Sequence, residues 1–587
     1  MLGKIIEIVD GKVCVKLEVN IYNMNNLSGK NVVFEDENTK IVGEVANVYS
    51  DRIEVNLIGQ IENNIFIYGD IIKPSFKSLC RVITKEELDI MFSNNKEENS
   101  ILLGKSFIYN NYDIRLNVNN FFSNHFAILG NTGSGKSHSV ARIIQSIFYE
   151  AKYLPFRTNI FLFDAYGEYQ QAFNQIGNIN ENINYKVYTT NLNTSEYELL
   201  KIPFWFLGVD DIALLLNAED QNQLPVIEKA LKLVSLFARD EEYVIKQKDD
   251  IIARSLLDII FSGKNPSFIR NKLVSVLTKF NTKNINLDIN LTKGGWTRNL
   301  RQCIFIEESG KFADIEIVIQ YLEEYVSDEF ELKVPDGSFM YTLDDFNLAL
   351  EFALISEGIL NSDKVYDYAN ILKVRLNNLI NSNYSKYFEY SNFVTKEDYI
   401  KILLTAPNGR KAQVINFNIN YVDDRLAKNI VKIYSKLLFD YIAGLKNRAS
   451  MPFHIVLEEA HRYVQNDKDK ELLGYNIFER IAKEGRKYGI LLGLISQRPS
   501  EISETTISQC SNFLIFKIFH PRDLEFINSV LPNINSGITS KLKTLHPGTC
   551  IIYGNAFKMP VIVKMERPNP TPLSNNCDIE NVWYIKK

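Results

Sequence analysis

The sequence predicts an α/β protein with a mostly parallel core sheet, a small β-barrel before that core and a helical bundle inserted into it. Three observations support this prediction. Short, alternating strand-like runs fill about the first 75 residues. From about residue 100 the apolar runs become nearly continuous, as in strands buried on both faces of a parallel sheet. A long, mostly helical stretch at roughly 210–400 separates two of these runs.

Composition places few limits on function. The 587 residues suffice for two or three domains, and a hydrophobic content of 45% supports ordinary globular cores. Basic residues number 66 and acidic residues 71, which gives a formal charge of −5. This balance neither supports nor excludes a nucleic-acid partner, because a ring-shaped protein can confine its basic residues to a pore.

The cysteines and the apolar segments indicate the setting of the protein. Six cysteines lie far apart without a CxxC pair, so we expect core thiols rather than a zinc site or a disulfide framework. The first residues alternate like a strand and lack the apolar block of a signal peptide. No apolar run approaches the roughly 18 residues of a membrane span. We therefore predict a soluble, cytoplasmic protein.

The N-terminal region, residues 1–95, is predicted to form the small barrel. Val13, Val15, Leu17 and Val19 alternate with polar or small residues, which is the period of a half-buried strand. Further strand-like runs follow, separated by turns that contain Asn, Asp and Gly. This pattern is typical of a small barrel or sandwich.

The core is predicted over residues 96–209 and 401–565. Its expected strands are the runs HFAIL, NIFLF, VINF, HIVL, ILLGLIS and NFLIF. Helical patterns between several of these runs match the crossovers of a parallel sheet. Residues 210–400 form the predicted helical insertion, and residues 566–587, rich in Pro and Asn, form an extended tail.

Two apolar stripes mark helices of the insertion. The first comprises Ile227, Ala230, Leu231 and Val234, and the second comprises Ile252, Leu256, Ile259 and Ile260. Both follow the spacing of one helix face. We interpret them as bundle core rather than as a ligand site.

The segment GNTGSGKS at residues 130–137 matches the phosphate-binding loop pattern G-x-x-x-x-G-K-[ST]. Glycines let backbone N–H groups curl around phosphates, the lysine reaches the β and γ phosphates, and the serine hydroxyl binds Mg²⁺. The residues expected to contact ATP are Gly130, Asn131, Thr132, Gly133, Ser134, Gly135, Lys136, Ser137 and His138. A strand candidate before this loop and a helix candidate after it argue against an ordinary glycine-rich turn.

A phosphate loop needs a carboxylate at the end of a neighbouring strand. The run HIVL is followed by Glu458 and Glu459. We predict Glu459 as the general base and Glu458 as the carboxylate on the Mg²⁺ side; a solvated acidic helix start is the alternative. Lys136 and Glu459 are 323 positions apart, and most of that separation is the helical insertion. Together these features predict an ATPase core of the RecA-like kind.

Two further strand ends carry polar residues. Asp164 and Glu168 follow the run NIFLF, and Asp164 is predicted to assist the metal or the water, with a strand-end cap as the alternative. Gln497 ends the run ILLGLIS, where its side chain could sense the γ-phosphate; an ordinary turn residue is the alternative.

Arg480 and Arg486 lie on a predicted helix whose apolar side faces the core. In ring ATPases an arginine of one subunit can stabilise transition-state charge in the neighbouring site. The spacing alone does not separate this role from that of a solvated charge, and Arg498 is a third candidate.

Several of these segments together resemble the HerA family, within the HerA/FtsK group of hexameric DNA translocases. The resemblance rests on HFAILGNTGSGKS, FDAYGEY, IVLEEAH, IAKEGRKYGILLGLISQRPSEI, SQCSNFLIFKI and LHPGTCIIYGNAFKMP, in this order. The acidic strand carries Glu-Glu where many P-loop enzymes have Asp-Glu. The long insertion favours the bacterial members that are associated with antiphage defence.

The resemblance implies a homohexamer with ATP sites between subunits and double-stranded DNA in the central pore. It favours Arg486 as the arginine finger and Gln497 as a sensor. It also implies that the tail acts as a brace on a neighbouring subunit. A partner effector is expected, either a nuclease or a sirtuin-like NAD-degrading enzyme.

The leading hypothesis is therefore a DNA-translocating ATPase that serves an effector. A second hypothesis is a nucleotide-bound hexameric scaffold that assembles or restrains a toxic effector, with translocation secondary. A third, a small-molecule phosphotransferase, would need a second substrate pocket, and no motif suggests one.

Overall fold

The computed structural model describes the chain except for residues 10, 20–25, 37–38, 70–71, 93–98, 110–111, 151, 240, 328–331, 361–362, 532–539, 575–577 and 585–587, and it gives the backbone alone for 356–360, 363–369 and 581. The chain divides into two compact units. The first comprises Met1–Glu198, Ile402–Asp467 and Ile477–Lys587, and the second comprises Leu199–Lys401 and Lys468–Asn476.

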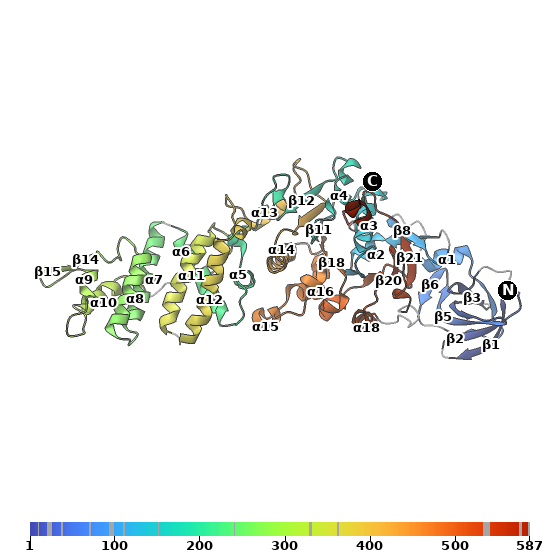
Figure 1. The fold of residues 1–587 in the computed structure, drawn as a ribbon, viewed down its shortest axis with the longest axis horizontal. Coiled ribbons are helices and arrows are strands. Elements are labelled where there is room, and N and C mark those ends of the chain that lie inside the picture. Colours follow the sequence, from blue (N-terminus) through green and yellow to red (C-terminus); the bar gives the residue numbers. More distant parts are fainter. Residues whose placement is uncertain are drawn as a thin grey trace. The chain divides into compact units, whose positions relative to one another are not determined.

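The N-terminal strands close into a barrel (Figure 1). They are β1 (Gly3–Val9), β2 (Lys12–Leu17), β3 (Asn31–Glu35), β4 (Lys40–Val48), β5 (Arg52–Glu62), β6 (Ile65–Tyr68) and β7 (Leu79–Val82). Their order is β2-β1-β7-β3-β4-β5-β6, and a further pairing between β2 and β5 closes the ring. The alternating residues Val13 and Val15 are fully buried inside, as the period of two predicted. Of the two predicted alternatives, the barrel is the one that forms.

A charge cluster fastens helix α1 (Lys85–Phe92) to the barrel. Both terminal nitrogens of Arg81 donate to the carboxylate of Glu87, at 2.7 and 2.8 Å, and Lys40 Nζ donates to the same carboxylate at 3.0 Å. Hydrogen bonds from Arg81 hold the pKa of Glu87 at about 2, although burial acts in the opposite direction. The bidentate geometry makes this a strong ion pair rather than an ordinary surface contact.

The core sheet has twelve strands in the order β13-β12-β16-β11-β17-β18-β10-β19-β20-β21-β8-β9. Their bounds are β8 (Ser100–Ser106), β9 (Asp113–Asn117), β10 (Phe126–Leu129), β11 (Ile160–Asp164), β12 (Tyr185–Thr189), β13 (Glu198–Leu199), β16 (Val414–Asn418), β17 (Phe453–Leu457), β18 (Ile490–Ser496), β19 (Asn512–Ile515), β20 (Thr549–Gly554) and β21 (Val561–Met565). From β12 to β19 the pairings are parallel, and from β19 to β9 they are antiparallel. The predicted α/β core with a mostly parallel sheet is confirmed.

Helices connect the parallel strands, as crossovers in such sheets require. They are α3 (Lys136–Tyr149), α4 (Gln170–Phe173), α14 (Asp424–Ala443), α16 (Ile477–Tyr488) and α17 (Glu504–Ile507). Two further helices of the core, α2 (Val118–Phe122) before β10 and α18 (Pro521–Val530) between β19 and β20, lie outside these crossovers. Buried residues of α3, such as Ile144, pack in one hydrophobic cluster with strand residues such as Ile128 and Leu162. This packing fixes the start of α3 at the edge where β10 ends.

The second unit is mostly helical (Figure 1). Its elements are α5 (Val209–Leu215), α6 (Gln223–Phe237), α7 (Glu242–Ile260), α8 (Pro266–Lys279), α9 (Leu300–Cys303), α10 (Ile315–Glu323), α11 (Leu343–Leu360), α12 (Asp363–Ile380), the hairpin strands β14 (Asn290–Lys293) and β15 (Trp296–Asn299), and α15 (Asp469–Leu473); α13 (Lys396–Leu403) leads out of it. Ile227, Ala230, Leu231 and Val234 are buried on α6, which packs on α11. On α7, Ile252, Leu256 and Ile259 are buried and Ile260 is partly buried. The two stripes are core, as predicted.

The chain returns to the helical unit once more, at residues 468–476. The Tyr475 hydroxyl donates to Asp210 Oδ2 at 2.8 Å, and Gln221 Nε2 donates to the backbone oxygen of Glu471 at 2.6 Å. The predicted insertion at 210–400 did not include this return.

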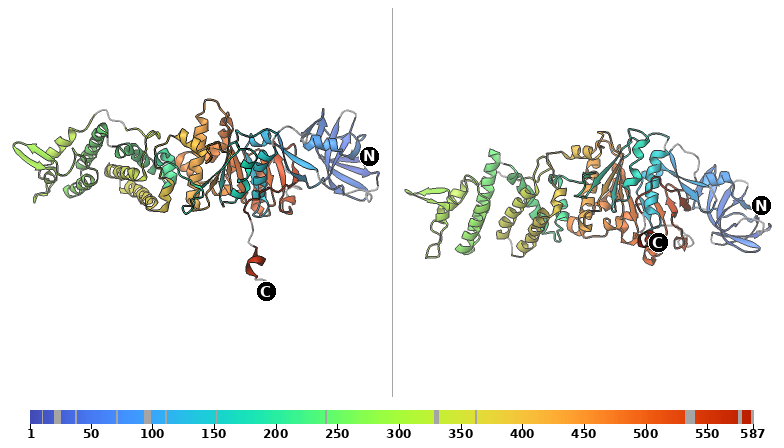
Figure 2. Two further views of the ribbon diagram at one scale, coloured as in Figure 1. Left: turned by 90° about the horizontal axis from the view of Figure 1, so that it is seen from above. Right: turned by 45° about the horizontal axis from the view of Figure 1, so that its top comes forward.

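The first part of the C-terminal tail lies against its own core. Gln145 on α3 donates to the backbone oxygen of Pro570 at 2.8 Å and accepts from the Asn569 N–H at 2.9 Å. The Leu573 N–H donates to the backbone oxygen of Glu168 at 2.8 Å. After residues 575–577 comes α20 (Ile579–Trp583), which stands clear of the sheet (Figure 2) and exposes Trp583. The predicted brace on a neighbouring subunit, residues 566–587, stays a prediction.

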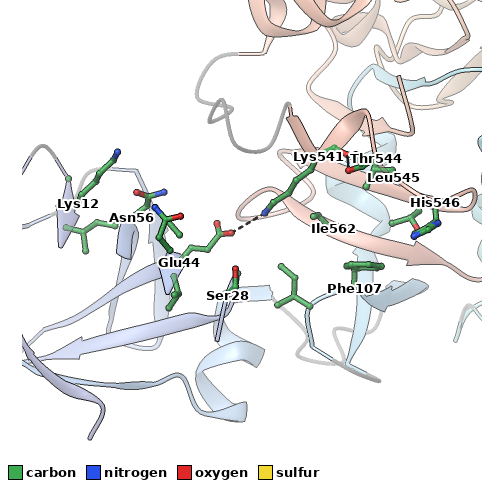
Figure 3. Close-up of a pocket in the computed structure, with 18 residues that line it drawn as sticks. Lys12, Ser28, Glu44, Asn56, Phe107, Lys541, Thr544, Leu545, His546 and Ile562 are labelled. Carbon is green, nitrogen blue, oxygen red and sulfur yellow. Dashed lines mark hydrogen bonds and ion pairs between the residues drawn. The ribbon is translucent and has the colours of Figure 1, made fainter. Parts of the chain in front are cut away.

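A cavity of about 790 Å³ lies where the barrel meets the β20–β21 side of the core (Figure 3). An ion pair spans it, with 3.5 Å between Lys541 Nζ and Glu44 Oε1. The segment with Leu545 and His546 forms part of its wall. The same segment continues to Gly548, whose N–H donates to the backbone oxygen of Ser134 at 2.8 Å.

No helix in the described ranges is long and apolar enough to cross a membrane. Cys14, Cys80, Cys303, Cys510 and Cys550 are free thiols, and Cys577 lies outside the described residues. Among the described residues no group of three or more His, Cys, Asp or Glu is arranged to hold a metal ion by itself.

Candidate nucleotide-binding site

The phosphate loop connects β10 to α3, and its glycines occupy backbone conformations that other residues avoid. The φ angles are 154° at Gly130, 72° at Gly133 and 109° at Gly135. A Cβ on Gly130 would lie 2.5 Å from the Cβ of Phe516, and one on Gly135 would lie 3.0 Å from the backbone of Gly548. These close approaches explain why the loop tolerates only glycine at both positions.

Lys136 is the first residue of α3, so it lies where the helix N–H groups point outward. Its Nζ donates to the backbone oxygen of Asn131 at 3.1 Å, which closes the loop on itself. Burial lowers the pKa of Lys136, while the charges of Glu459, Glu458 and Glu168 raise it. The lysine and three carboxylates therefore share one site.

Glu458 and Glu459 follow the last residue of β17 and are both buried. Glu458 Oε2 accepts the N–H of Ala165 at 3.0 Å. Burial, followed by the neighbouring charge of Asp164, raises the pKa of Glu458 well above its usual value. Burial also raises the pKa of Glu459, and the positive charge of Lys136 acts against that shift. A solvated acidic helix start, the alternative for this pair, does not describe these buried side chains.

Glu459 has an unusual side-chain environment and an unusual backbone conformation. Glu459 Oε2 is buried without a hydrogen-bond donor, and the residue has a φ of 49°, which is rare for a side chain with a Cβ. A buried oxygen without a donor beside a lysine and a glycine-rich loop fits a site for a phosphate group and its water. Ser137 and Glu458 are the residues suited to hold Mg²⁺ there.

Asp164 acts as a strand-end cap. Its Oδ1 accepts the N–H groups of Gly167 at 2.7 Å and Glu168 at 3.0 Å, and its Oδ2 accepts the N–H of Tyr169 at 3.0 Å. Asn416 donates to Oδ2 as well, at 3.2 Å. Donors within the protein thus occupy both oxygens of Asp164. These contacts are those of a strand-end cap, which was the alternative to the predicted assistance to the metal or the water.

Glu168 is the acidic residue of this loop that faces the site, and sequence reasoning gave it no role. The hydroxyl of Ser137 and the charge of Lys136 both act to lower the pKa of its carboxyl group. Burial raises the pKa of Glu168. The available signal was its position four residues after Asp164, at the end of the same turn.

Gln497 follows β18 and contacts the phosphate loop directly. The Thr132 hydroxyl donates to Gln497 Oε1, and the N–H of Gly130 donates to the backbone oxygen of Ser496 at 3.1 Å. The backbone N–H of Gln497 lowers the pKa of Glu459, against the larger effect of burial, which raises it. Gln497 thus lies between the loop and the predicted base, which an ordinary turn residue would not do.

The candidate arginines occupy different parts of the core. Arg486, exposed at the end of α16, influences the charge state of His125, which precedes β10 at the edge opposite the phosphate loop. Arg480 stacks on the ring of Phe439 at 4.8 Å. Neither arginine belongs to the site of its own chain.

Two other arginines lie closer to Glu459. Arg498 pairs with Glu501 at 2.9 Å, and Arg462, absent from the prediction, donates from its N–H to the backbone oxygen of Glu459 at 2.8 Å. The charges of both arginines lower the pKa of Glu459. His138, the last predicted loop contact, lies 3.3 Å from the hydroxyl of Ser574 in the tail.

A glycine-rich loop that closes on Lys136, facing buried carboxylates at the ends of parallel strands, defines a P-loop ATPase. The sequence model of the family described as "Helicase HerA, central domain" matches residues 101–438, more than half of the chain. The chain belongs to this family.

Curated relatives extend the similarity beyond that domain. The chain is 26% identical over 571 residues to the DNA double-strand break repair helicase HerA of Sulfurisphaera tokodaii, covering 92% of this chain and 88% of that protein. It is 25% identical over 589 residues to the protein of the same name from Sulfolobus acidocaldarius, covering 95% and 92%. Among solved structures, VirB4 of Thermoanaerobacter pseudethanolicus matches with a TM-score of 0.42 and 14% identity, covering 80% of this chain and 97% of that one.

Proposed function

We propose that this protein is an ATP-driven translocase of double-stranded DNA that works as a homohexamer. The observation that carries the proposal is the convergence of Lys136, Glu168, Glu458 and Glu459 at the end of the parallel strands. Family membership and the names of the curated relatives, which are DNA repair helicases, support DNA as the substrate.

The proposed chemistry is ATP hydrolysis. Lys136 binds the β and γ phosphates, and Ser137 and Glu458 hold Mg²⁺, which neutralises phosphate charge when bound. Glu459 accepts a proton from the attacking water. Burial favours this role because it raises the pKa of the carboxyl group. Gln497 senses the γ-phosphate through its link to Thr132.

The position of Arg486 supports the proposed hexamer. Arg486 lies at the edge of the sheet opposite the site of its own chain, so we propose that it completes the site of a second copy. Contacts of this head-to-tail kind close into rings. Helix α20, which exposes Val582 and Trp583, supports the proposal that this helix braces a neighbouring subunit.

The test is DNA-stimulated ATPase activity of the purified protein. We expect duplex DNA to raise turnover at low salt, and added salt to remove the stimulation because phosphate contacts release counterions. Lys136→Ala abolishes turnover, whereas Lys105→Ala, which changes an exposed lysine on β8, retains it. Turnover that ignores duplex DNA at low salt contradicts the translocase, and turnover that survives Lys136→Ala contradicts the ATPase site.

We further propose that the motor serves a partner effector, a nuclease or a sirtuin-like NAD-degrading enzyme, in antiphage defence. The long helical insertion supports this proposal, because it resembles that of the family members associated with antiphage defence. Glu459→Gln distinguishes motor from scaffold: an assembled ring that no longer hydrolyses ATP leaves the effector inactive if hydrolysis drives it. An effector that stays active with that ring favours the scaffold.

A further inference from the structure

His461 lies beside the proposed general base without a role in the chemistry described above. It belongs to η5 (Ala460–Arg462), the short 3-10 helix that begins directly after Glu459. Its imidazole is buried, and Nδ1 lies 3.2 Å from Glu459 Oε2 and 3.1 Å from the hydroxyl oxygen of Ser496. Nδ1 of His461 therefore lies close to both the proposed general base and the end of β18.

Ser496 anchors this nitrogen to the strand beside the phosphate loop. The N–H of Arg498 donates to the Ser496 hydroxyl oxygen at 3.0 Å, and the Ser496 backbone oxygen accepts the N–H of Gly130 at 3.1 Å. Both contacts hold the end of β18. His461 is therefore held by the same strand end that supports the loop.

Glu459 needs such support. Its left-handed backbone conformation costs free energy that the surroundings must supply. The backbone N–H of Gln497 lowers the pKa of the carboxyl group, while Oε2 has no aligned donor. The imidazole Nδ1 is 3.2 Å from that oxygen, close enough to donate after a small rotation of either side chain.

We propose that His461 is a positioning residue for Glu459. With its hydrogen on Nδ1, the neutral imidazole donates to Glu459 Oε2 and shares that hydrogen with the Ser496 hydroxyl oxygen, which lies 3.1 Å from the same nitrogen. The carboxylate is then fixed between the Gln497 N–H and His461, with its remaining lone pairs directed at the water. Burial lowers the pKa of His461 to about 4, consistent with a neutral ring. The inference rests on the proposed ATPase function of this site.

The experiment uses three substitutions at this residue in the full-length hexamer. His461→Asn puts an amide nitrogen near the position of Nδ1, His461→Gln puts it near that of Nε2, and His461→Ala removes both. We expect His461→Ala and His461→Gln to lower kcat about 10- to 100-fold with KM for ATP changed less than threefold, the usual effect of losing an outer partner. His461→Asn restores kcat to within about fivefold of the wild type. His520→Ala, at an exposed histidine, is the matched control.

A binding measurement separates positioning from simple loss of structure. ADP with aluminium fluoride and Mg²⁺ mimics the transition state, so its affinity reports the geometry around Glu459 without turnover. We expect His461→Ala to weaken binding of this complex about tenfold, while binding of ADP alone stays unchanged.

Equal activity of the Ala and Asn variants, or an equal loss of affinity for ADP, overturns the inference. A failure of the proposed ATPase site gives another result, because Lys136→Ala would then also leave turnover intact. The Lys136→Ala variant therefore separates failure of the proposed function from failure of this inference.

Discussion

The hydroxyl of Thr132 in the phosphate loop donates a hydrogen bond to Oε1 of Gln497 at the end of β18. The backbone N–H of the same glutamine lies close enough to Glu459 to lower the pKa of its carboxyl group, against the larger effect of burial. One residue therefore contacts both the loop that binds phosphate and the proposed base. If Gln497 is the proposed sensor, a change at the γ-phosphate would reach Glu459 through the side chain and the backbone of this one residue.

This relationship predicts the behaviour of Thr132 variants. Thr132→Val removes the hydroxyl but keeps the shape of the side chain, and we expect kcat to fall about tenfold, equivalent to about 1.4 kcal/mol. Thr132→Ser keeps the donor and retains activity within about twofold. Steady-state ATPase kinetics of both variants and of Gln497→Ala provide the check. Equal rates for the Val and Ser variants contradict the link.

Glu459→Gln removes the proposed base and keeps the side-chain volume. We expect kcat to fall about 10²- to 10⁴-fold, the usual contribution of general base catalysis, with ATP affinity preserved. Single-turnover hydrolysis and calorimetric ATP binding measure the two quantities separately. Glu458→Gln provides the comparison, because it should raise the Mg²⁺ concentration needed for activity. Turnover of the Glu459→Gln variant above about a tenth of the wild-type rate would rule out the assignment.

Arg486 offers a test of sites shared between subunits. Lys136→Ala and Arg486→Ala each inactivate a uniform ring, because every site then lacks a required group. In rings mixed from both variants, some interfaces join an intact Lys136 to an intact Arg486, so we expect partial recovery of ATPase activity. Mixtures made with Arg480→Ala in place of Arg486→Ala serve as the control. No recovery in verified mixed rings argues that Arg486 does not act in its neighbour.

The cluster around Glu87 predicts a pH-dependent contribution to the barrel. The pKa of this carboxyl is about 2 in the folded state against an ordinary 4.5. The stabilisation is therefore complete above about pH 4.5 and is lost as the pH falls toward 2, and it amounts to about 3 kcal/mol. Glu87→Gln should accelerate amide hydrogen exchange in β7 and α1 at pH 7. The exposed neighbour variant Glu86→Gln should not, and equal exchange in both variants would contradict the prediction.

Much of the core followed from the sequence because its patterns are local. Buried parallel strands are continuous apolar runs, and their carboxyl ends meet at one edge, so the loop at 130–137 and the pair Glu458 and Glu459 could be placed together. Whether Asp164 assists a metal or caps the end of its strand depends on which backbone N–H groups of the next turn donate to it. The spacing of apolar residues does not predict those donors.

The relationships that escaped sequence reasoning are contacts between distant segments. The interaction of Ser137 with Glu168, the approach of His461 to Ser496, and the tail's contact with Gln145 each join residues whose own neighbourhoods look ordinary. The return of residues 468–476 to the helical unit interrupts what reads as one continuous core segment. Such contacts depend on strand order in the sheet, which the sequence pattern leaves open.

The strand order has a consequence for synthesis of the chain on the ribosome. β16 pairs between β11 and β12, yet 224 residues lie between Thr189, which ends β12, and Val414, which begins β16. At about 5–20 residues per second, β11 and β12 wait about 10–45 s for the strand between them. Most of the helical unit is synthesised in that interval, and its residues 468–476 follow later. A nascent chain released before residue 414 would leave β10 and β11 without their partner strands and β12 without β16, so several unpaired strand edges would face other chains.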